Sequence, residues 1–160
     1  MVKTLPGFTG YYPGPGGRFT WEGSVRKKPI LCVDFDGVIH AYTTPWTDAV
    51  TISDGPVPGA LQWLWRATEF FDVQVYSSRS KDPEARGAMA AWFLTHSRAE
   101  FPDGHPMRSA VGEYPITFAH EKPPAFLTID DRAVTFDGDW SDPTLDPAFL
   151  LTFKPWNKRP

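Results

Sequence analysis

Short apolar runs alternate with helix-like segments from Pro29 onward, and this alternation constrains the fold more than any other feature of the chain. The first helix follows Pro58-Gly59, and the second has Asp82 at its N-cap and Pro83 at its first position, residues that favour helix starts. Alternating strands and helices predict an α/β fold, a Rossmann-like three-layer α/β/α domain with a mainly parallel sheet and helices on both faces. The predicted strands cover residues 30–35, 73–76, 114–118 and 126–129, and the helices residues 60–71 and a segment beginning at 82.

The 160 residues fit a single domain with additions at both ends. Residues 1–28 are rich in Gly, Pro and aromatics and predict an irregular arm. Residues 29–152 form the expected domain, within which 97–113 predict a long loop, and 153–160 predict an extended tail. Because disordered segments are usually poor in aromatics, we expect the arm to pack on the domain or on a neighbouring subunit, which would make the protein a homo-oligomer.

Composition and charge argue against several classes of protein. No apolar run approaches the roughly 20 residues that span a bilayer, and the N-terminus lacks the apolar stretch of a secretory signal, so we expect a cytoplasmic protein with no membrane role. The net charge of −3 gives no long-range attraction for nucleic acid. The single cysteine, Cys32, lies inside an apolar run and is expected to be a small core hydrophobe.

Reactive or phosphate-binding side chains follow each of the four predicted strands. Ligands of open parallel sheets bind at the carboxyl ends of the strands, so these side chains should gather at one edge. One such set alone would be ordinary, since Asp-Gly and Asp-Asp are common in turns, but four sets together indicate a site. In chain order they are Asp34, Asp36 and Gly37, then Ser77, Ser78 and Arg79, then Lys122, and finally Asp130 and Asp131.

The acidic residues in this set predict a metal. Carboxylates on neighbouring strand ends repel each other unless a cation lies between them, and their hard oxygens suit Mg²⁺. Asp34 and Asp130 therefore predict a magnesium site. The metal would let an anionic carboxylate approach an anionic phosphate, with Lys122 as a second positive charge and Ser77 as a hydrogen-bond donor to a phosphoryl oxygen.

The ordered motifs Asp34-Phe35-Asp36-Gly37-Val38, Ser77, Lys122 and Asp130-Asp131 resemble those of the haloacid dehalogenase (HAD) superfamily, over about residues 29–140. The resemblance implies a HAD-like phosphohydrolase in which Asp34 attacks phosphorus and forms an aspartyl-phosphate. It also implies that Asp36 protonates the leaving oxygen and then activates water, while its backbone carbonyl helps to hold Mg²⁺. The implied phosphate-binding residues are Ser77, Ser78, Lys122 and Gly37, and the implied metal residues are Asp34, Asp36, Asp130 and Asp131.

Some assignments within this scheme stay open. A one-residue slip of register would exchange Ser77 and Ser78, and Asp131 is either a metal ligand or a support of one. Arg79 is expected to be a solvated or loop-pinning residue rather than a phosphate clamp, although its guanidinium suits phosphate. His40 and His120 flank the predicted pocket and are substrate contacts at most.

The lengths of the connecting segments bear on the substrate. Residues 38–59 have room for a small flap but not for a helical cap domain, and the third strand runs almost directly into Lys122. Such an open site favours a macromolecular substrate or closure by another subunit. The end of the second strand is similar to that of nucleotidases and polynucleotide phosphatases in the superfamily, so a nucleotide or a nucleic-acid end is one expected substrate class beside small phosphorylated metabolites.

Two other functions were weighed against the phosphohydrolase. A non-catalytic phosphate-binding or assembly module would keep the fold without turnover. A site that no longer catalyses a reaction, however, has no physical need to hold several carboxylates close together. A receiver-like phosphoacceptor domain also combines acids, a hydroxyl and a lysine. A receiver places its lysine last, however, whereas Lys122 precedes Asp130-Asp131 here.

Overall fold

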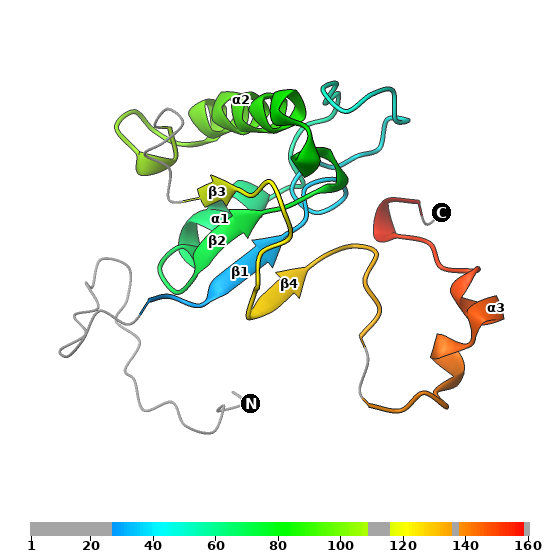
Figure 1. Cartoon of the computed structure of the whole chain (residues 1–160). Helices are drawn as coiled ribbons and strands as arrows, with labels where there is room; N and C mark the ends of the chain where they lie inside the picture. Colours follow the sequence, from blue (N-terminus) through cyan, green and yellow to red (C-terminus); the bar gives the residue numbers. More distant parts are fainter. Residues whose placement is uncertain (1–26, 109–115, 136–137, 159–160) are drawn as a thin grey trace.

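The computed structural model describes residues 27–108, 116–135 and 138–158, and these form an α/β domain around a four-stranded sheet (Figure 1). All strand pairs are parallel, and the strand order is β3-β2-β1-β4. The predicted parallel sheet is therefore confirmed. The strands are β1 (Ile30–Val33), β2 (Asp72–Val75), β3 (Ile116–Phe118) and β4 (Leu127–Ile129). The helices are α1 (Ala60–Ala67), α2 (Pro83–Glu100) and α3 (Pro147–Leu150), with 3-10 turns η1 (Ser78–Lys81), η2 (Pro106–Arg108), η3 (Pro143–Leu145) and η4 (Trp156–Lys158).

Both predicted helices begin where the sequence places them. Gly59 precedes α1 with φ = 81°, a left-handed conformation that glycine adopts without strain. Asp82 caps α2 by accepting a hydrogen bond from the amide of Glu84. The predicted loop over 97–113 is wrong in its first part, because the buried face of α2 continues to Ser97 and the helix ends only after Glu100. Among the described residues, no helix has both the length and the apolar character needed to cross a membrane.

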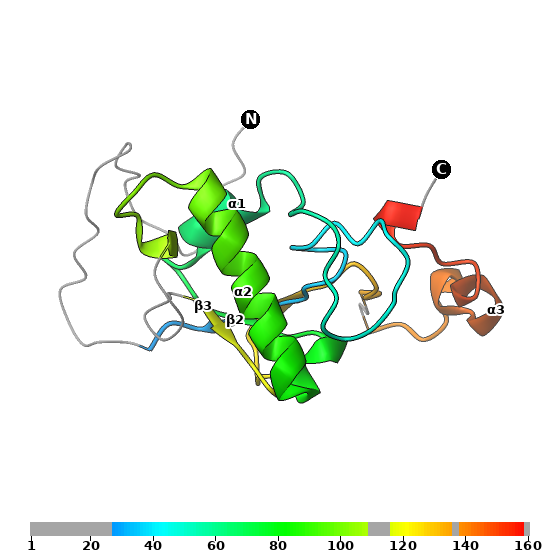
Figure 2. The same ribbon diagram turned by 90° about the horizontal axis from the view of Figure 1, so that it is seen from above.

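The apolar core lies between one face of the sheet and both long helices. Right-handed crossovers explain why α1 and α2 share that face, because β1 to β2 and β2 to β3 are steps in the same direction across the sheet. Figure 2 shows α2 lying over β2 and β3. The fully buried members of this core include Leu31, Val33, Val73 and Val75 from the sheet, Leu61 and Leu64 from α1, and Met89 and Phe93 from α2.

The opposite face of the sheet carries small and polar side chains. Cys32, Gln74 and Thr128 are neighbours there across β2, β1 and β4. The connection from β3 to β4, residues 119–126, contains no helix and crosses in front of the sheet in Figure 1. The expectation of helices on both faces is therefore wrong for the part of the chain that the structure describes, where only this connection crosses the second face.

The segment between β1 and α1 folds into a flap. After β1 the chain makes one tight turn, in which the amides of Ile39 and His40 donate to the carbonyl oxygen of Phe35. Residues 39–41 and 55–57 then pair in antiparallel fashion and form a stem. Residues 42–54, called the flap loop below, extend from this stem. Tyr42 begins the flap loop with φ = 52°, a left-handed conformation that is uncommon for any residue except glycine.

The C-terminal segment returns to the base of this flap after passing beyond β4 (Figures 1 and 2). Trp156 Nε1 donates to the Gly37 carbonyl oxygen at 2.6 Å. Asn157 Nδ2 donates to the carbonyl oxygens of Ala41 at 3.1 Å and Tyr42 at 3.0 Å. Residues that we expected to form an extended tail thus bind the loop that follows β1. The proposed arm lies outside the described residues, apart from its last two positions, 27 and 28.

Candidate active site at the carboxyl ends of the strands

A cavity of about 240 Å³ lies at the carboxyl ends of the strands. The chain segments that follow all four strands contribute to its lining, together with two aromatic residues of the flap loop. Of the residues selected from the sequence, Asp34, Asp36, Ser77, Ser78, Lys122 and Asp130 line the cavity. Gly37 and Asp131 are not part of this lining and pack against each other. The structure therefore brings the four sequence motifs into one region.

Asp34, Asp130 and Asp131 form an acidic triad. One carboxylate oxygen from each lies within 4.8 Å of the other two. The amide of Asp34 donates to the carbonyl oxygen of Ile129 at 2.9 Å, which fixes the end of β1 beside the acids that follow β4. Asp130 accepts a hydrogen bond from the amide of Arg132 at 2.7 Å, so its own turn is also fixed. The geometry suits a cation bound among three carboxylates.

The carboxylate of Asp131 is buried and lacks a hydrogen-bond partner among the described residues. Its side chain is 1% exposed, and the nearest cationic atom, Arg132 Nε, is 3.8 Å from Oδ1. Gly37 closes off the other side, since a Cβ atom there would lie 2.5 Å from Asp131 Oδ2. An ionised carboxylate in such a position costs several kcal/mol unless it is paired. A hard divalent cation such as Mg²⁺ would provide the missing partner, so the triad fits the expected metal.

The electrostatics of Asp34 also point to a cation. Burial raises the pKa of Asp34 to about 7; a hydrogen bond from the Phe35 amide opposes this rise, and the neighbouring carboxylates add to it. A carboxylate must be ionised to act as a nucleophile or a ligand. A positive charge beside Asp34 would lower this pKa and keep the group ionised at neutral pH.

We expect the metal-free protein to lose thermal stability as the pH rises from about 4 to about 7. In this window the folded Asp34 keeps its proton while the unfolded chain, with an Asp pKa near 3.9, has lost it. The native state then binds more protons, so its stability falls with rising pH, by about 1.4 kcal/mol for each unit of pKa difference. Thermal melting measured by calorimetry should show this slope, which Asp34→Asn should flatten. An identical slope in both proteins would contradict the raised pKa of the half-buried Asp34 carboxyl group.

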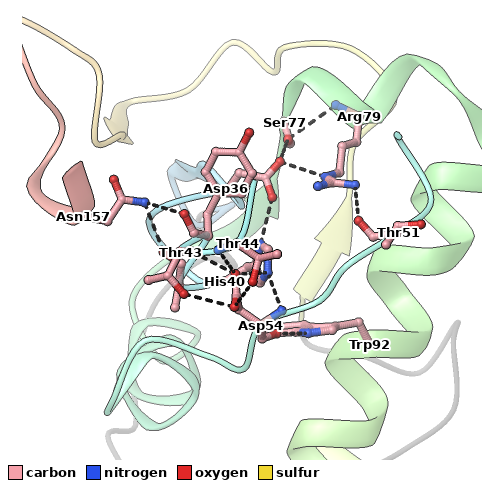
Figure 3. A network of polar contacts seen from close by, with 12 residues as sticks. Asp36, His40, Thr43, Thr44, Thr51, Asp54, Ser77, Arg79, Trp92 and Asn157 are labelled. Atoms are coloured by element: carbon pink, nitrogen blue, oxygen red, sulfur yellow. Dashed lines mark hydrogen bonds and ion pairs between the residues drawn. The ribbon is translucent and has the colours of Figure 1, made fainter. Parts of the chain in front are cut away.

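Asp36 lies at the centre of a buried polar network (Figure 3). Its Oδ1 is 2.9 Å from His40 Nδ1, and its Oδ2 is 2.8 Å from Arg79 Nε and 3.5 Å from Ser77 Oγ. Burial alone would raise the pKa of Asp36, but the hydrogen bonds from His40 and Arg79 outweigh it and hold the pKa below its usual range. Both oxygens are thus engaged, and this carboxylate is not part of the acidic triad. The expected metal contact of Asp36, through its backbone carbonyl, stays a prediction, and so does its role as proton donor, to which the engaged carboxylate adds no support.

Arg79 joins Asp36 to one arm of the flap loop. Its side chain is 2% exposed, and Nη1 donates to the carbonyl oxygens of Asp48, Ala49 and Thr51 at 3.2, 2.6 and 3.0 Å. The guanidinium carbon also lies 4.3 Å from the ring centroid of Trp46. Of the two roles expected from the sequence, Arg79 thus pins a loop and is not a solvated residue.

His40 and Asp54 join Asp36 to the other arm of the flap loop. His40 Nε2 accepts from the Asp54 amide at 3.2 Å, so the imidazole proton lies on Nδ1 and is donated to Asp36. The Asp54 carboxylate accepts the amides and hydroxyls of Thr43 and Thr44, and these bonds lower its pKa to about 2. His40 is buried in this network rather than being placed to contact a substrate. The sequence analysis missed Asp54, which carries no motif.

Hydroxyl groups and cations complete the lining of the cavity. Ser77 is buried and caps η1, where its Oγ accepts from the Arg79 amide at 3.4 Å, whereas Ser78 is exposed. Lys122 lines the cavity together with Arg132, a cation that the sequence analysis did not select. His120, which we expected beside the pocket, is exposed, does not contribute to the lining and lies 3.6 Å from Glu121. Lys122, Arg132 and the two serines thus line the same cavity as Asp34 and Asp130.

Comparison of the chain with protein-family models, curated proteins and solved structures finds no match. The statements about architecture therefore rest on the sheet itself, whose four parallel strands in the order β3-β2-β1-β4 are consistent with a Rossmann-like fold. The likeness to HAD motifs remains a resemblance of residues and their order.

Proposed function

We propose that this protein is a Mg²⁺-dependent phosphomonoesterase that acts through an aspartyl-phosphate on Asp34. The observation that carries the proposal is the acidic triad, in which the buried Asp131 carboxylate has no hydrogen-bond partner among the described residues. Three carboxylates crowded this closely repel one another, and the ion pair of Asp131 with Arg132 at 3.8 Å offsets only part of their charge, so a bound cation would stabilise them. Mg²⁺, when bound, would offset most of the negative charge of this triad and polarise a phosphoryl oxygen.

The side chains around the cavity attack and bind the phosphoryl group in this proposal. An oxygen of Asp34 forms a bond to phosphorus while the bond from phosphorus to the ester oxygen breaks, and the ester oxygen keeps the electron pair and takes a proton from solvent. Water then attacks the aspartyl-phosphate, which releases inorganic phosphate and restores the Asp34 carboxylate. Lys122 and Arg132 balance the negative charge of the phosphoryl group, and the hydroxyl of Ser77 or Ser78 donates to one of its oxygens. The cavity offers these groups at the carboxyl ends of parallel strands, where such sites are generally found.

Asp36 takes a narrower role in this proposal than the resemblance implies. Its lowered pKa opposes donation of a proton to the leaving oxygen, because the group is ionised at neutral pH. An ionised Asp36 can still accept a proton from the attacking water once a bond to His40 or Arg79 loosens. In the structure its carboxylate positions the flap.

Phosphate release from p-nitrophenyl phosphate tests the proposal directly. We expect the full chain to be inactive after treatment with EDTA and to regain activity when Mg²⁺ is added, because the triad repels an anionic ester without the cation. Ca²⁺ should support less turnover than Mg²⁺. Ca²⁺ prefers more oxygen ligands, at longer distances, than Mg²⁺ does, and three carboxylates with water suit the smaller ion better. Equal turnover in EDTA would argue against the metal.

The engaged state of Asp36 also favours a second candidate, a phosphate-binding or assembly module without turnover. Both oxygens of this carboxylate are already bonded, as expected for a purely structural group. Such a module would bind inorganic phosphate in the presence of Mg²⁺ but release none from any ester. Calorimetric titration with phosphate, run beside the release assay, separates the two candidates.

A further inference from the structure

Aromatic side chains form one wall of the cavity. Tyr42 and Trp46 come from the flap loop, and Tyr76 follows β2. Trp46 is 48% exposed. An exposed tryptophan alone means little, since single apolar residues are common on protein surfaces. Trp46 differs because it lines the same cavity as Asp34 and Asp130 and because its ring is held in place.

Arg79 fixes the orientation of the Trp46 ring. The guanidinium carbon lies over the ring at 4.3 Å from its centroid, and Arg79 is itself held by Asp36 and by three carbonyl oxygens of the flap loop. The guanidinium lies over one face of the indole, so a ligand ring would stack on the opposite face. A ring that is already ordered loses little conformational entropy when it stacks on a ligand.

Tyr42 is held beside the same cavity at the cost of backbone strain. Its φ of 52° is unfavourable for a tyrosine and persists only where surrounding contacts impose it. Its carbonyl oxygen accepts hydrogen bonds from Asn157 Nδ2 and Lys158 Nζ at 3.0 and 3.2 Å. Its ring has two cations nearby, Arg132 at 5.8 Å and Lys158 at 5.3 Å from the centroid. The C-terminal segment thus holds this residue in position.

We propose that Trp46 and Tyr42 form a stacking site for a planar ring in the leaving group, so that the substrates are small aryl or nucleoside phosphate monoesters. This inference rests on the proposed phosphatase function of the same cavity. The volume of about 240 Å³ is at the small end for ligand sites, which suits a phosphoryl group and one ring rather than a large substrate. Lys122 and Arg132 favour the phosphoryl end, while the aromatic wall favours the ring.

The test compares three phosphate esters: p-nitrophenyl phosphate, adenosine 5′-monophosphate and glycerol 2-phosphate, which has no ring. The readout is the ratio of kcat/KM for each ring ester to that for glycerol 2-phosphate. Trp46→Leu should lower this ratio about tenfold through KM, a loss in the range of one base–aromatic stack, and Trp46→Phe should restore most of it. The ring ester whose ratio falls more in Trp46→Leu shows whether the stacked ring belongs to an aryl group or to a nucleoside. Ratios in Trp46→Leu equal to those of the wild type would overturn the stacking site.

Trp63→Leu is the matched control, because Trp63 is 41% exposed on α1 and does not line the cavity. Its ratios should equal those of the wild type, and a fall equal to that of Trp46→Leu would overturn the assignment. Calorimetric binding of adenosine 5′-monophosphate separates this inference from the proposed function. If no ester is hydrolysed, the phosphatase proposal fails, and weaker binding by Trp46→Leu still supports the stacking site. Absent binding by the wild type, or equal binding by both proteins, overturns it.

Discussion

Replacement of Asp34 by asparagine should lower Mg²⁺-dependent phosphate release at least about a thousandfold. The carboxamide oxygen is a poor nucleophile for phosphorus, and the change also removes one anionic oxygen from the acidic triad. The loss should appear in kcat for p-nitrophenyl phosphate. Mass spectrometry of acid-quenched reactions should detect a phosphoryl adduct on the wild type but none on Asp34→Asn.

The melting temperature of Asp34→Asn distinguishes a loss of catalytic activity from a loss of folded protein. Burial raises the pKa of Asp34 to about 7, so its replacement by a neutral amide should leave the melting temperature above pH 7 unchanged or higher. Asp103→Asn is the matched control, because that carboxylate is 94% exposed and pairs with Arg108 away from the cavity. Activity of Asp34→Asn within tenfold of the wild type would rule out Asp34 as the nucleophile.

Replacement of Arg79 by methionine should destabilise the protein by about 3–5 kcal/mol, because it leaves the buried Asp36 carboxylate without its charged partner. For a chain of this length, that loss corresponds to a fall in melting temperature of about 10 °C. The carbonyl oxygens of Asp48, Ala49 and Thr51 would lose their shared donor as well, so amide exchange in the flap loop should accelerate. Calorimetry and hydrogen exchange measure the two effects.

A double-mutant cycle with Asp36→Asn attributes this loss to the ion pair. The double variant should be more stable than the sum of the single losses predicts, by about 1 kcal/mol or more, because the second change no longer leaves a buried charge unpaired. Arg66→Met on the exposed side of α1 is the control and should stay within about 0.5 kcal/mol of the wild type. Additive losses at Asp36 and Arg79 would contradict the coupling described here.

The fold was predictable from the sequence where short-range interactions determine it. Asp82 caps α2 through an amide two residues away, and Gly59 begins α1 through its own backbone conformation. The predicted helices on both faces failed because the rule for alternating strands and helices presumes a helix in each crossover. Residues 119–126 contain none, and Pro123-Pro124 within them disfavours one.

The candidate site was predictable only where the topology of the sheet determines it. Parallel pairing brings Asp34 beside Ile129, and hence beside Asp130 and Asp131, whatever the intervening chain does. The partners of Asp36 were not predictable, because Arg79 lies 43 residues from Asp36 in the sequence. The flap carbonyl groups that bind Arg79 lie 28 to 31 residues before Arg79, between the two side chains in the sequence. The pKa of Asp36 depends on those partners, so the sequence did not reveal that this carboxylate, which the resemblance makes a proton donor, has a lowered pKa.

The position of Cys32 has a practical consequence. It is the only thiol in the 160 residues, and it is buried on the wall of the cavity that Asp34 also lines. Burial raises its pKa, so alkylating reagents will find little thiolate until the surrounding chain opens. The rate of its alkylation therefore serves as an intrinsic reporter of opening motions at the cavity. A covalent fragment attached there would be anchored in the cavity that Asp34, the proposed nucleophile, also lines, without any engineered attachment point.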